Sequence, residues 1–271
     1  MLYKYMTSKR FLENRKIKFS RPSELAIFND TMDCVPAAVL IEDKRRIAEE
    51  IAERNRDKKF LMNFVESGFD FDKAKELTEI HAQSYIEHCI NSDESEFYLG
   101  IAKNTIDEHI AIFSLSKNHL NRVMWTHYAG GHTGYVIAFD ENHEFFKERI
   151  GSSISFSMPL PVIYQDKRAT ILKSPGNCVK VGDNFHLIKE RKWIYEEELR
   201  VIALNETGWP IGFILIDVPA SAVKGIILGK EVNAEEEREM RSLIKALLPE
   251  IPIVKIRCRV DGSFETSPKF P

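Results

Sequence analysis

The chain has 271 residues, with 38 Lys and Arg against 41 Asp and Glu, a formal net charge of −3 and 44% hydrophobic residues. These values are typical of a globular protein and exclude a disordered, collagen-like or coiled-coil chain. The balanced charge argues against general adhesion to nucleic acid or to a membrane surface. The longest apolar run, around residues 211–218, is far shorter than the roughly 18–20 residues that cross a membrane. We expect no membrane span and, because no secretory signal is visible, a cytoplasmic protein.

The first two fifths of the chain open with β-type patterns and then turn helical. Residues 2–5 and 17–19 favour short strands around a helical turn. From about residue 41 to residue 107 the pattern is helical, with Ile47, Ala48, Ile51 and Ala52 on one face and further helices expected over 74–90 and 94–106. We interpret these roughly 65 residues as a helical insertion.

Strand patterns return after the insertion. Five β-type segments are expected to form one sheet, and they cover residues 110–115, 134–140, 199–204, 211–218 and 223–228. Asn233 is a good N-cap for a helix that must end before Pro249, and the alternation over 254–260 predicts a strand with one buried face. Without strict βαβ alternation, repeats or linkers, the sequence predicts one α+β domain over 1–271, with a central mixed, largely antiparallel sheet and flanking helices.

The densest cluster of reactive side chains is the run from Trp193 to Ile202, which contains Glu196, Glu197 and Glu198. If a strand begins by Glu196, its period of two aims Glu196 and Glu198 at one face. Two carboxylates on one face can divide acid and base work, because their repulsion raises one pKa. The alternative is a solvated acidic turn that pairs with Arg191, Lys192 or Arg200.

Two further clusters offer pocket-forming side chains. Aromatic, hydroxyl and imidazole groups of residues 113–117 and 124–134 could surround a base or a nicotinamide ring, with His127 or His132 handling protons; the alternative is that the glycines form turns and the histidines are structural. Near the N-terminus, Asn29, Asp30 and Asp33 favour a polar turn, or else Lys4, Arg21 and Asn29 supply donors for a phosphate or carboxylate.

Metal chemistry and standard nucleophilic catalysis have no clear pattern in the sequence. The four cysteines, Cys34, Cys89, Cys178 and Cys258, are widely spaced, and we expect most of them to be buried small hydrophobes. The spacing of His127 and His132 does not fit a helix-borne zinc site, and no Gly-x-Ser-x-Gly elbow is present. We predict no metal.

Taken in order, these clusters resemble a bacterial and phage family catalogued as domain of unknown function 2971. The motifs that carry the resemblance are Tyr3-Lys4-Tyr5, Lys18-Phe19-Ser20-x-Pro22 with Asn29-Asp30-x-Met32-Asp33, Ser114-Leu115-Ser116, Met124-Trp125-x-His127-Tyr128-Ala129-x-x-His132-x-Gly134, Trp193-x-Tyr195-Glu196-x-Glu198-x-Arg200 and Ile226-Ile227-Leu228-Gly229. They span nearly the whole chain apart from the insertion. The family name assigns no activity.

A more distant likeness suggests an activity. A basic residue on an early strand, a Ser-x-Ser on a middle strand and a Glu-x-Glu on a later one resemble the arginine-serine-glutamate class of ADP-ribosyltransferases. The equivalents here are Lys4, Ser114 with Ser116, and Glu196 with Glu198. The sequence departs from that class in having Lys where Arg or His is usual and Leu115 where Thr is usual, and Lys cannot make a bidentate fork to phosphate.

This likeness implies that NAD is the substrate. By resemblance, Glu198 stabilises the oxocarbenium-like state that forms as the nicotinamide–ribose bond breaks, and Glu196 orients or deprotonates the acceptor. Lys4 would meet the pyrophosphate, Ser114 would brace the catalytic carboxylate, and Ser116 and His127 would complete the pocket. Tyr5 and Tyr128 would stack on nicotinamide. The acceptor, a protein or nucleic acid or water, is left open, and the genomes in which the family occurs suggest a phage-defence or toxin-like effector.

Two other functions compete with this hypothesis. One is a non-catalytic interaction module whose Trp clusters form a core and whose insertion presents a partner surface. The other is a metal-dependent nuclease that would use Asp30, Asp33, His127 and His132. The enzyme hypothesis requires Glu196 and Glu198 to converge with Ser114 and Tyr5 on one open pocket, whereas the module hypothesis allows these side chains to be scattered or buried in ion pairs.

Overall fold

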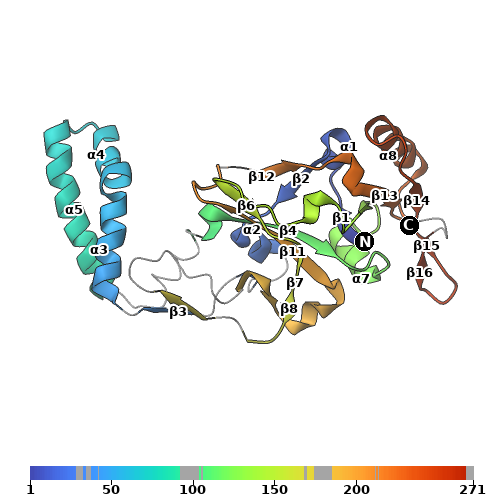
Figure 1. Cartoon of the computed structure of the whole chain (residues 1–271), viewed down its shortest axis with the longest axis horizontal. Coiled ribbons are helices and arrows are strands. Elements are labelled where there is room, and N and C mark those ends of the chain that lie inside the picture. Colours follow the sequence, from blue (N-terminus) through green and yellow to red (C-terminus); the bar gives the residue numbers. More distant parts are fainter. Residues whose placement is uncertain are drawn as a thin grey trace. The chain divides into compact units, whose positions relative to one another are not determined.

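The computed structural model describes residues 1–28, 33–34, 38–41, 43–91, 104, 106–167, 170–173, 185–210, 212 and 214–266. The chain divides into two compact units (Figure 1). The first contains Met1–Cys34, Asp107–Lys167 and His186–Pro271, and the second contains Val35–Ile106 and Arg168–Phe185. The sequence placed a helical insertion at about 41–107; the second unit takes in nearly these residues and adds a segment from much later in the chain.

A mixed sheet of eight strands forms the centre of the first unit. Its order is β14-β13-β5-β1-β4-β11-β6, with β7 also paired to β11. The strands are β1 (Leu2–Met6), β4 (Ile110–Ser116), β5 (Tyr135–Phe139), β6 (Ile154–Phe156), β7 (Leu160–Pro161), β11 (Glu198–Asn205), β13 (Val223–Leu228) and β14 (Ile253–Lys255). Within this sheet β13 and β14 are parallel and the other registers are antiparallel, so the predicted α+β class with a mixed, largely antiparallel sheet is confirmed.

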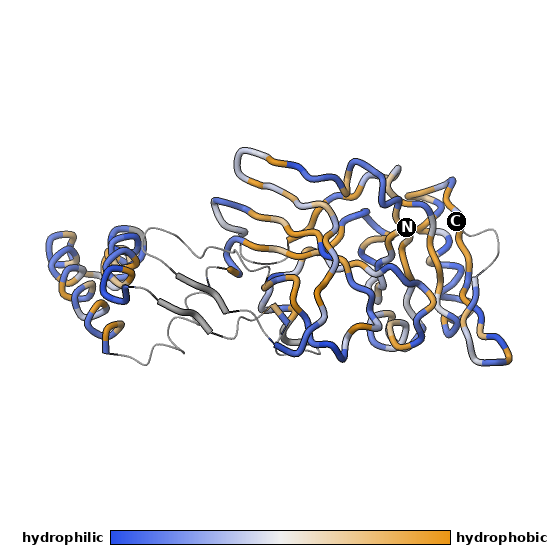
Figure 2. The backbone as a smooth tube through the Cα atoms, turned by 60° about the horizontal axis from the view of Figure 1, so that its bottom comes forward, coloured by the Kyte–Doolittle hydropathy of each residue, from blue (hydrophilic) through white to orange (hydrophobic). Residues whose placement is uncertain are grey.

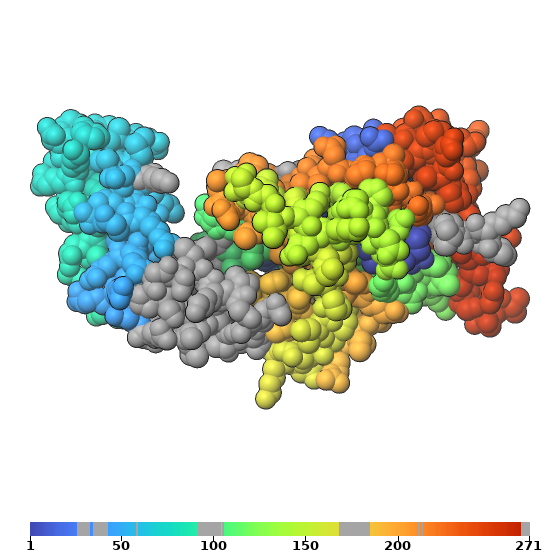
Figure 3. Space-filling model, in the orientation of Figure 1, coloured from blue at the N-terminus to red at the C-terminus, as the bar shows by residue number. Residues whose placement is uncertain are grey.

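The sheet buries both faces, because successive side chains of a strand point to opposite sides. One face packs Leu2, Phe113 and Ile137 against helices α1 (Arg10–Asn14) and α8 (Ala234–Leu247). The other face places Tyr5 and Val136 against helix α7 (Arg122–Tyr128). Hydrophobic stretches follow the central strands in Figure 2. The segment with β6 and β7, yellow-green in Figure 3, covers the far edge of β11.

Two predicted strands are corrected. Strand β12 (Ile214–Asp217) does not join the central sheet but pairs with β2 (Lys16–Phe19), whose buried Ile17 and Phe19 complement it. Residues 211 and 213 of the predicted segment lie outside the described residues. The single strand predicted over 254–260 is instead divided, because β14 pairs with β13 whereas β15 (Arg257–Cys258) forms a hairpin with β16 (Phe264–Glu265). Val260 is therefore exposed, not buried.

The C-terminal helix follows its prediction. Helix α8 begins after Asn233, whose side chain accepts hydrogen bonds from the backbone N–H groups of Glu235 and Glu236, and it ends at Leu247 before Pro249. The side chain of Asn233 thus satisfies two of the four free N–H groups at the helix start. Met240 and Ile244 bury its apolar face.

The second unit combines helices with a short parallel ribbon. Its helical elements are α3 (Lys44–Asn55), the π-helix η1 (Arg56–Leu61), α4 (Met62–Glu66) and α5 (Phe71–Asn91). They enclose a small core that includes Ala48, Ala52, Ala82 and Cys89. Strands β3 (Ala38–Ile41) and β9 (Thr170–Lys173) pair in parallel. Most of the helix predicted over 94–106 lies outside the described residues. No helix in the described part of the chain is long and apolar enough to span a membrane.

Gly134, immediately before β5, is tightly enclosed by backbone. A Cβ at this position would lie 2.1 Å from the carbonyl oxygen of Met6, which cannot move without disturbing β1. We therefore expect Gly134→Ala to lower the free energy of unfolding by more than about 2 kcal/mol in denaturant titrations. The control is Gly131→Ala, where φ is +61° but the space is open, so a cost of only about 1–2 kcal/mol is expected. Equal costs for the two variants would contradict this reading.

Candidate active site

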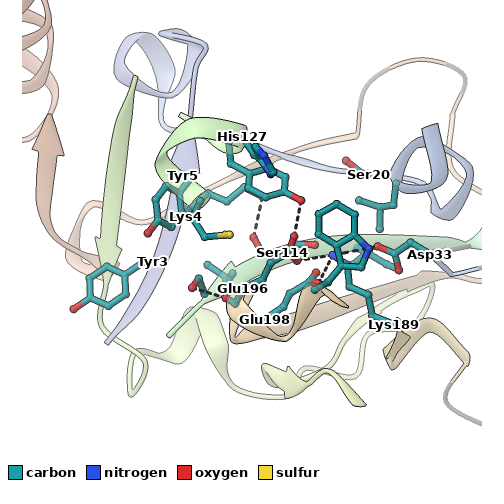
Figure 4. Close-up of a pocket in the computed structure, with 17 residues that line it drawn as sticks. Tyr3, Lys4, Tyr5, Ser20, Asp33, Ser114, His127, Lys189, Glu196 and Glu198 are labelled. Atoms are coloured by element: carbon teal, nitrogen blue, oxygen red, sulfur yellow. Dashed lines mark hydrogen bonds and ion pairs between the residues drawn. The ribbon is translucent and has the colours of Figure 1, made fainter. Parts of the chain in front are cut away.

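A cavity of about 240 Å³ lies where β1 and β4 separate. The two strands share one register, Tyr3 with Ser116, and Ile112 further along β4 pairs instead with Ser20. Strand β11 continues beside β4 over seven registers. The eight residues that the ADP-ribosyltransferase likeness assigned to the site all line this cavity, six of them labelled in Figure 4: Lys4, Tyr5, Ser114, Ser116, His127, Tyr128, Glu196 and Glu198. The structure thus brings together residues from both ends of the chain.

Glu196 and Glu198 face the cavity for a reason that the sequence did not reveal. The strand does not begin by Glu196, which instead ends the 3-10 helix η4 (Arg191–Glu196). Glu197 then adopts a left-handed conformation with φ of +46°, and Glu198 is the first residue of β11. A left-handed turn, and not the period of a strand, therefore brings the two carboxylates together.

The alternative of a solvated acidic turn is wrong for these two residues. Glu196 is 3% exposed and Glu198 is 6% exposed. Glu197 alone of the three is exposed, and it accepts a hydrogen bond of 2.9 Å from Asn118 Nδ2. The two basic residues that precede the cluster pair elsewhere: Arg191 with Asp166, and Lys192 with Glu190.

Lys189 is a buried cation shared by three carboxylates. It lies in β10 (Ile188–Lys189), which pairs with β8 (Ile163–Tyr164). Its Nζ is 2.5 Å from Glu196 Oε2, 3.0 Å from Glu198 Oε2 and 3.5 Å from Asp33 Oδ2. Sequence reasoning missed this residue, because nothing in the local pattern separates it from the exposed Arg191 and Lys192 nearby.

Arg200 neutralises the carboxylates from the other side. It lies two residues after Glu198 on the same face of β11 and is fully buried. Its Nε donates to Glu198 Oε1 at 2.8 Å, and its Nη2 donates to Asp33 Oδ1 at 2.8 Å and to Glu198 Oε2 at 3.0 Å. The sequence indicated Arg200 only as a partner for a surface turn, and Asp33 only as a turn or nuclease residue.

These cations give the two glutamates different acidities. Burial opposes the charge on Glu198, but Arg200 and Lys189 outweigh it and hold the pKa of Glu198 well below its usual value. Burial and the charge of Glu198 raise the pKa of Glu196 against the opposing pull of Lys189. Tyr128 Oη donates a 2.6 Å hydrogen bond to Glu196 Oε1. Glu198 is therefore ionised near neutral pH, while Glu196 is the carboxyl closer to titrating.

The other strand residues take separate positions around this pair. Lys4 Nζ donates to the carbonyl oxygen of Ser114 at 2.8 Å, and burial lowers the pKa of Lys4 to about 8 although Glu198 and Glu196 oppose the shift. The Ser114 hydroxyl hydrogen-bonds Glu198 and helps to keep it ionised. Ser116 Oγ donates to the carbonyl oxygen of Glu196 at 2.7 Å, so its hydroxyl fixes the turn.

The aromatic residues form one wall of the cavity. Tyr5 Oη donates to the carbonyl oxygen of Asn118 at 2.8 Å, and its ring meets Trp125 edge to face. Tyr128 is held by Glu196, and His127 is exposed at the cavity (Figure 4). Both tyrosine hydroxyls are thus bonded within the protein, which leaves their rings as the parts able to contact a ligand.

Several candidate residues lie apart from the cavity. His132 packs against Trp125 and its Nε2 is 3.3 Å from Thr126 Oγ1, while Arg21 donates to the carbonyl oxygens of Pro210 and Gly212. Asn29, Asp30 and Cys178 lie outside the described residues. Cys34 and Cys89 are buried, whereas Cys258 is exposed. Across the described ranges, no three His, Cys, Asp or Glu side chains are grouped as metal ligands would be.

His186, next to this cluster, makes stability depend on pH. Burial, with the charge of Arg200, lowers the pKa of His186 from 6.5 to about 4. Between these values the unfolded chain binds the extra proton, so the folded state loses stability as the pH falls. We expect protonation of His186 in the unfolded chain to lower the free energy of unfolding by about 2 kcal/mol between pH 7 and pH 5. In denaturant titrations, the free energy of unfolding of His186→Phe should therefore fall by about 2 kcal/mol less over this pH range than that of the unchanged protein. An equal fall in both proteins would refute the assignment.

The comparisons with known proteins bear on one part of the site. No curated protein and no solved structure matches the chain. A family described as "Protein of unknown function (DUF2971)" matches residues 124–201, which run from α7 into β11. The expected resemblance is confirmed there. Over the stretch that carries His127, Tyr128, Glu196 and Glu198, the chain therefore matches the DUF2971 family.

Proposed function

We propose that the cavity binds NAD and cleaves its nicotinamide–ribose bond, as an ADP-ribosyltransferase does. One observation carries the proposal. A basic residue of β1, a serine of β4 and two glutamates on either side of the turn into β11 meet at one cavity, although about 190 residues separate the first from the last. The interaction-module hypothesis accounts for buried ion pairs, but it gives no reason for these side chains to line a common cavity.

The two glutamates suit the two halves of such a reaction. As the bond between the ribose carbon and the nicotinamide nitrogen breaks, its electron pair leaves with nicotinamide and positive charge develops on the ribose. The ionised Glu198 would stabilise that charge. An acceptor O–H would then bond to the ribose carbon while its proton passes to Glu196, whose raised pKa suits a general base.

The remaining groups match the rest of a dinucleotide. Small-molecule pockets usually enclose about 300–1,000 Å³, and the cavity of about 240 Å³ lies below this range, so it would receive only the nicotinamide end of NAD. The rings of Tyr5 and Tyr128 offer apolar faces for nicotinamide. The Lys4 ammonium has one hydrogen bond to the described residues, and its other protons are available to a phosphate oxygen.

The Glu196-Glu197-Glu198 run supplies its own matched control. With NAD as the substrate, we expect Glu198→Gln to reduce nicotinamide release at least about 100-fold and Glu196→Gln to reduce it about 10- to 100-fold. Glu197→Gln removes an exposed charge outside the cavity and should stay within about twofold of the unchanged protein.

Calorimetric titration with NAD accompanies the assay. Glu198→Gln also leaves Arg200 and Lys189 short of a partner, so its melting temperature should fall, and retained NAD binding would show that the variant is folded. Absence of binding by the unchanged protein at millimolar NAD would overturn the proposal. Nicotinamide release by the Glu198→Gln variant at the rate of the unchanged protein would also overturn the proposal.

The hydrogen bond from Tyr128 predicts a pH effect. Because it stabilises the ionised form of Glu196, its loss in Tyr128→Phe should raise the pKa of Glu196 further. A general base works only when ionised, so the acid limb of kcat/KM should move to higher pH by about one unit. Tyr195→Phe changes a neighbouring hydroxyl that is not bonded to Glu196 and should leave the limb in place. A shift to lower pH in Tyr128→Phe would exclude Glu196 as the base.

A further inference from the structure

Glu196 has room for one more hydrogen bond on each of its carboxylate oxygens. An ionised carboxylate accepts hydrogen bonds at about four lone-pair sites. The described bonds of Glu196 use one site of each oxygen, because Oε1 accepts from Tyr128 at 2.6 Å and Oε2 accepts from Lys189 at 2.5 Å. Glu196 can therefore take a proton from a group in the cavity while it stays bonded to the protein.

Glu198 has its acceptor sites filled. Arg200 donates to it from Nε and from Nη2, Lys189 donates to Oε2, and the Ser114 hydroxyl adds a further bond. These donors match the roughly four sites of a carboxylate. Glu198 can thus act on a substrate through its charge, whereas Glu196 is the member of the pair that can receive the proton of an acceptor.

The position of Glu196 limits the size of the acceptor that can reach it. Its side chain is 3% exposed and lines the cavity of about 240 Å³, whose walls include the buried rings of Tyr5 and Trp193. The nicotinamide end of NAD would take most of this space, whereas a water molecule needs only about 30 Å³. A serine, an arginine or a nucleotide of a macromolecule brings its own backbone with it. Water is therefore the acceptor that fits beside Glu196.

The neighbouring Glu197 shows the contrast with a macromolecular acceptor. A large acceptor presents its reacting group on a surface, so the carboxylate that deprotonates this group must be exposed as well. The exposed carboxylate of this run is Glu197, which lies outside the cavity and is bonded to Asn118. The run thus buries the carboxylate that lies at the cavity and exposes the one that does not.

We propose that water is the acceptor, so that the protein hydrolyses NAD to ADP-ribose and nicotinamide. The bond between the ribose carbon and the nicotinamide nitrogen breaks, and its electron pair leaves with nicotinamide. The water oxygen then bonds to the ribose carbon, and one water proton passes to Glu196, which later releases it to the solvent. The inference rests on the proposed function, because it names the acceptor of that same reaction.

Product analysis with NAD and the purified protein tests the inference. We expect free ADP-ribose and nicotinamide in equal amounts, with no ADP-ribose attached to the protein. When methanol and 1-propanol are added at equal molarity, methanol should give at least about ten times more alkyl ADP-ribose, because the larger alcohol overfills the space beside Glu196. Equal yields from the two alcohols would overturn the inference, since they would show an acceptor position that admits large groups.

Azide tests the role of Glu196 in the same reaction. It is a small anion that attacks without a base, so it should accelerate nicotinamide release by Glu196→Gln about tenfold or more and form azido-ADP-ribose. The matched control, Glu197→Gln, retains the base and should not respond to azide. Equal responses of the two variants, including none in either, would overturn the inference. The comparison of alcohols needs no variant, so it decides the inference if Glu196→Gln does not fold.

A failure of the proposed function gives a different result. In that case no nicotinamide is released from NAD, and both conclusions are overturned together. Nicotinamide release without an equal amount of free ADP-ribose would overturn the inference and leave the proposed function standing. Release that begins only when a protein or a nucleic acid is added would also overturn the inference alone.

Discussion

The neutralisation of three buried carboxylates by Lys189 and Arg200 is the interaction on which the rest of the site depends. Removing one partner from a buried ion pair costs about 3–5 kcal/mol, because the other charge is left without water or a counter-charge. Asp33 and Glu198 pair with both cations and Glu196 pairs with Lys189, so the three carboxylates depend on these two side chains. Those cations come from different elements, so the site exists only when β10, β11 and the segment before residue 35 are all in place.

This dependence separates the acidities of two carboxyls that are close neighbours in the chain. Glu198 is shared by both cations, whereas Glu196 is paired with Lys189 and receives a neutral hydrogen bond from Tyr128. Unequal partners give unequal pKa values, and such pairs are what acid–base chemistry uses. A purely structural ion-pair network has the same components, but here Lys189, Glu196 and Glu198 also line a cavity.

The sequence predicted those parts of the fold that local patterns encode. Periodicity and capping located α8 from Asn233 onward, and β-type segments separated by turn residues located β4, β5, β11 and β13. The sequence misplaced β12, because a β-type segment does not name its partner strand. The sequence did not predict the role of Lys189, because that role depends on the buried position that the pairing of β8 with β10 creates and not on the neighbouring residues in the chain. The cavity residues were chosen because their motifs occur in a characteristic order along the chain. That they meet at one cavity depends on the pairing of strands distant in the sequence, which this order does not encode.

The left-handed residue between the two glutamates has a consequence for how this chain can vary. Glu197 has an exposed side chain, and the turn requires its backbone more than its carboxylate. Glycine and asparagine adopt this conformation at lower cost than glutamate, so either residue could replace Glu197 at the middle position of the Glu-x-Glu motif. A distant relative with Glu-Gly-Glu in place of Glu-Glu-Glu would therefore be expected to keep the same turn and the same two carboxylates.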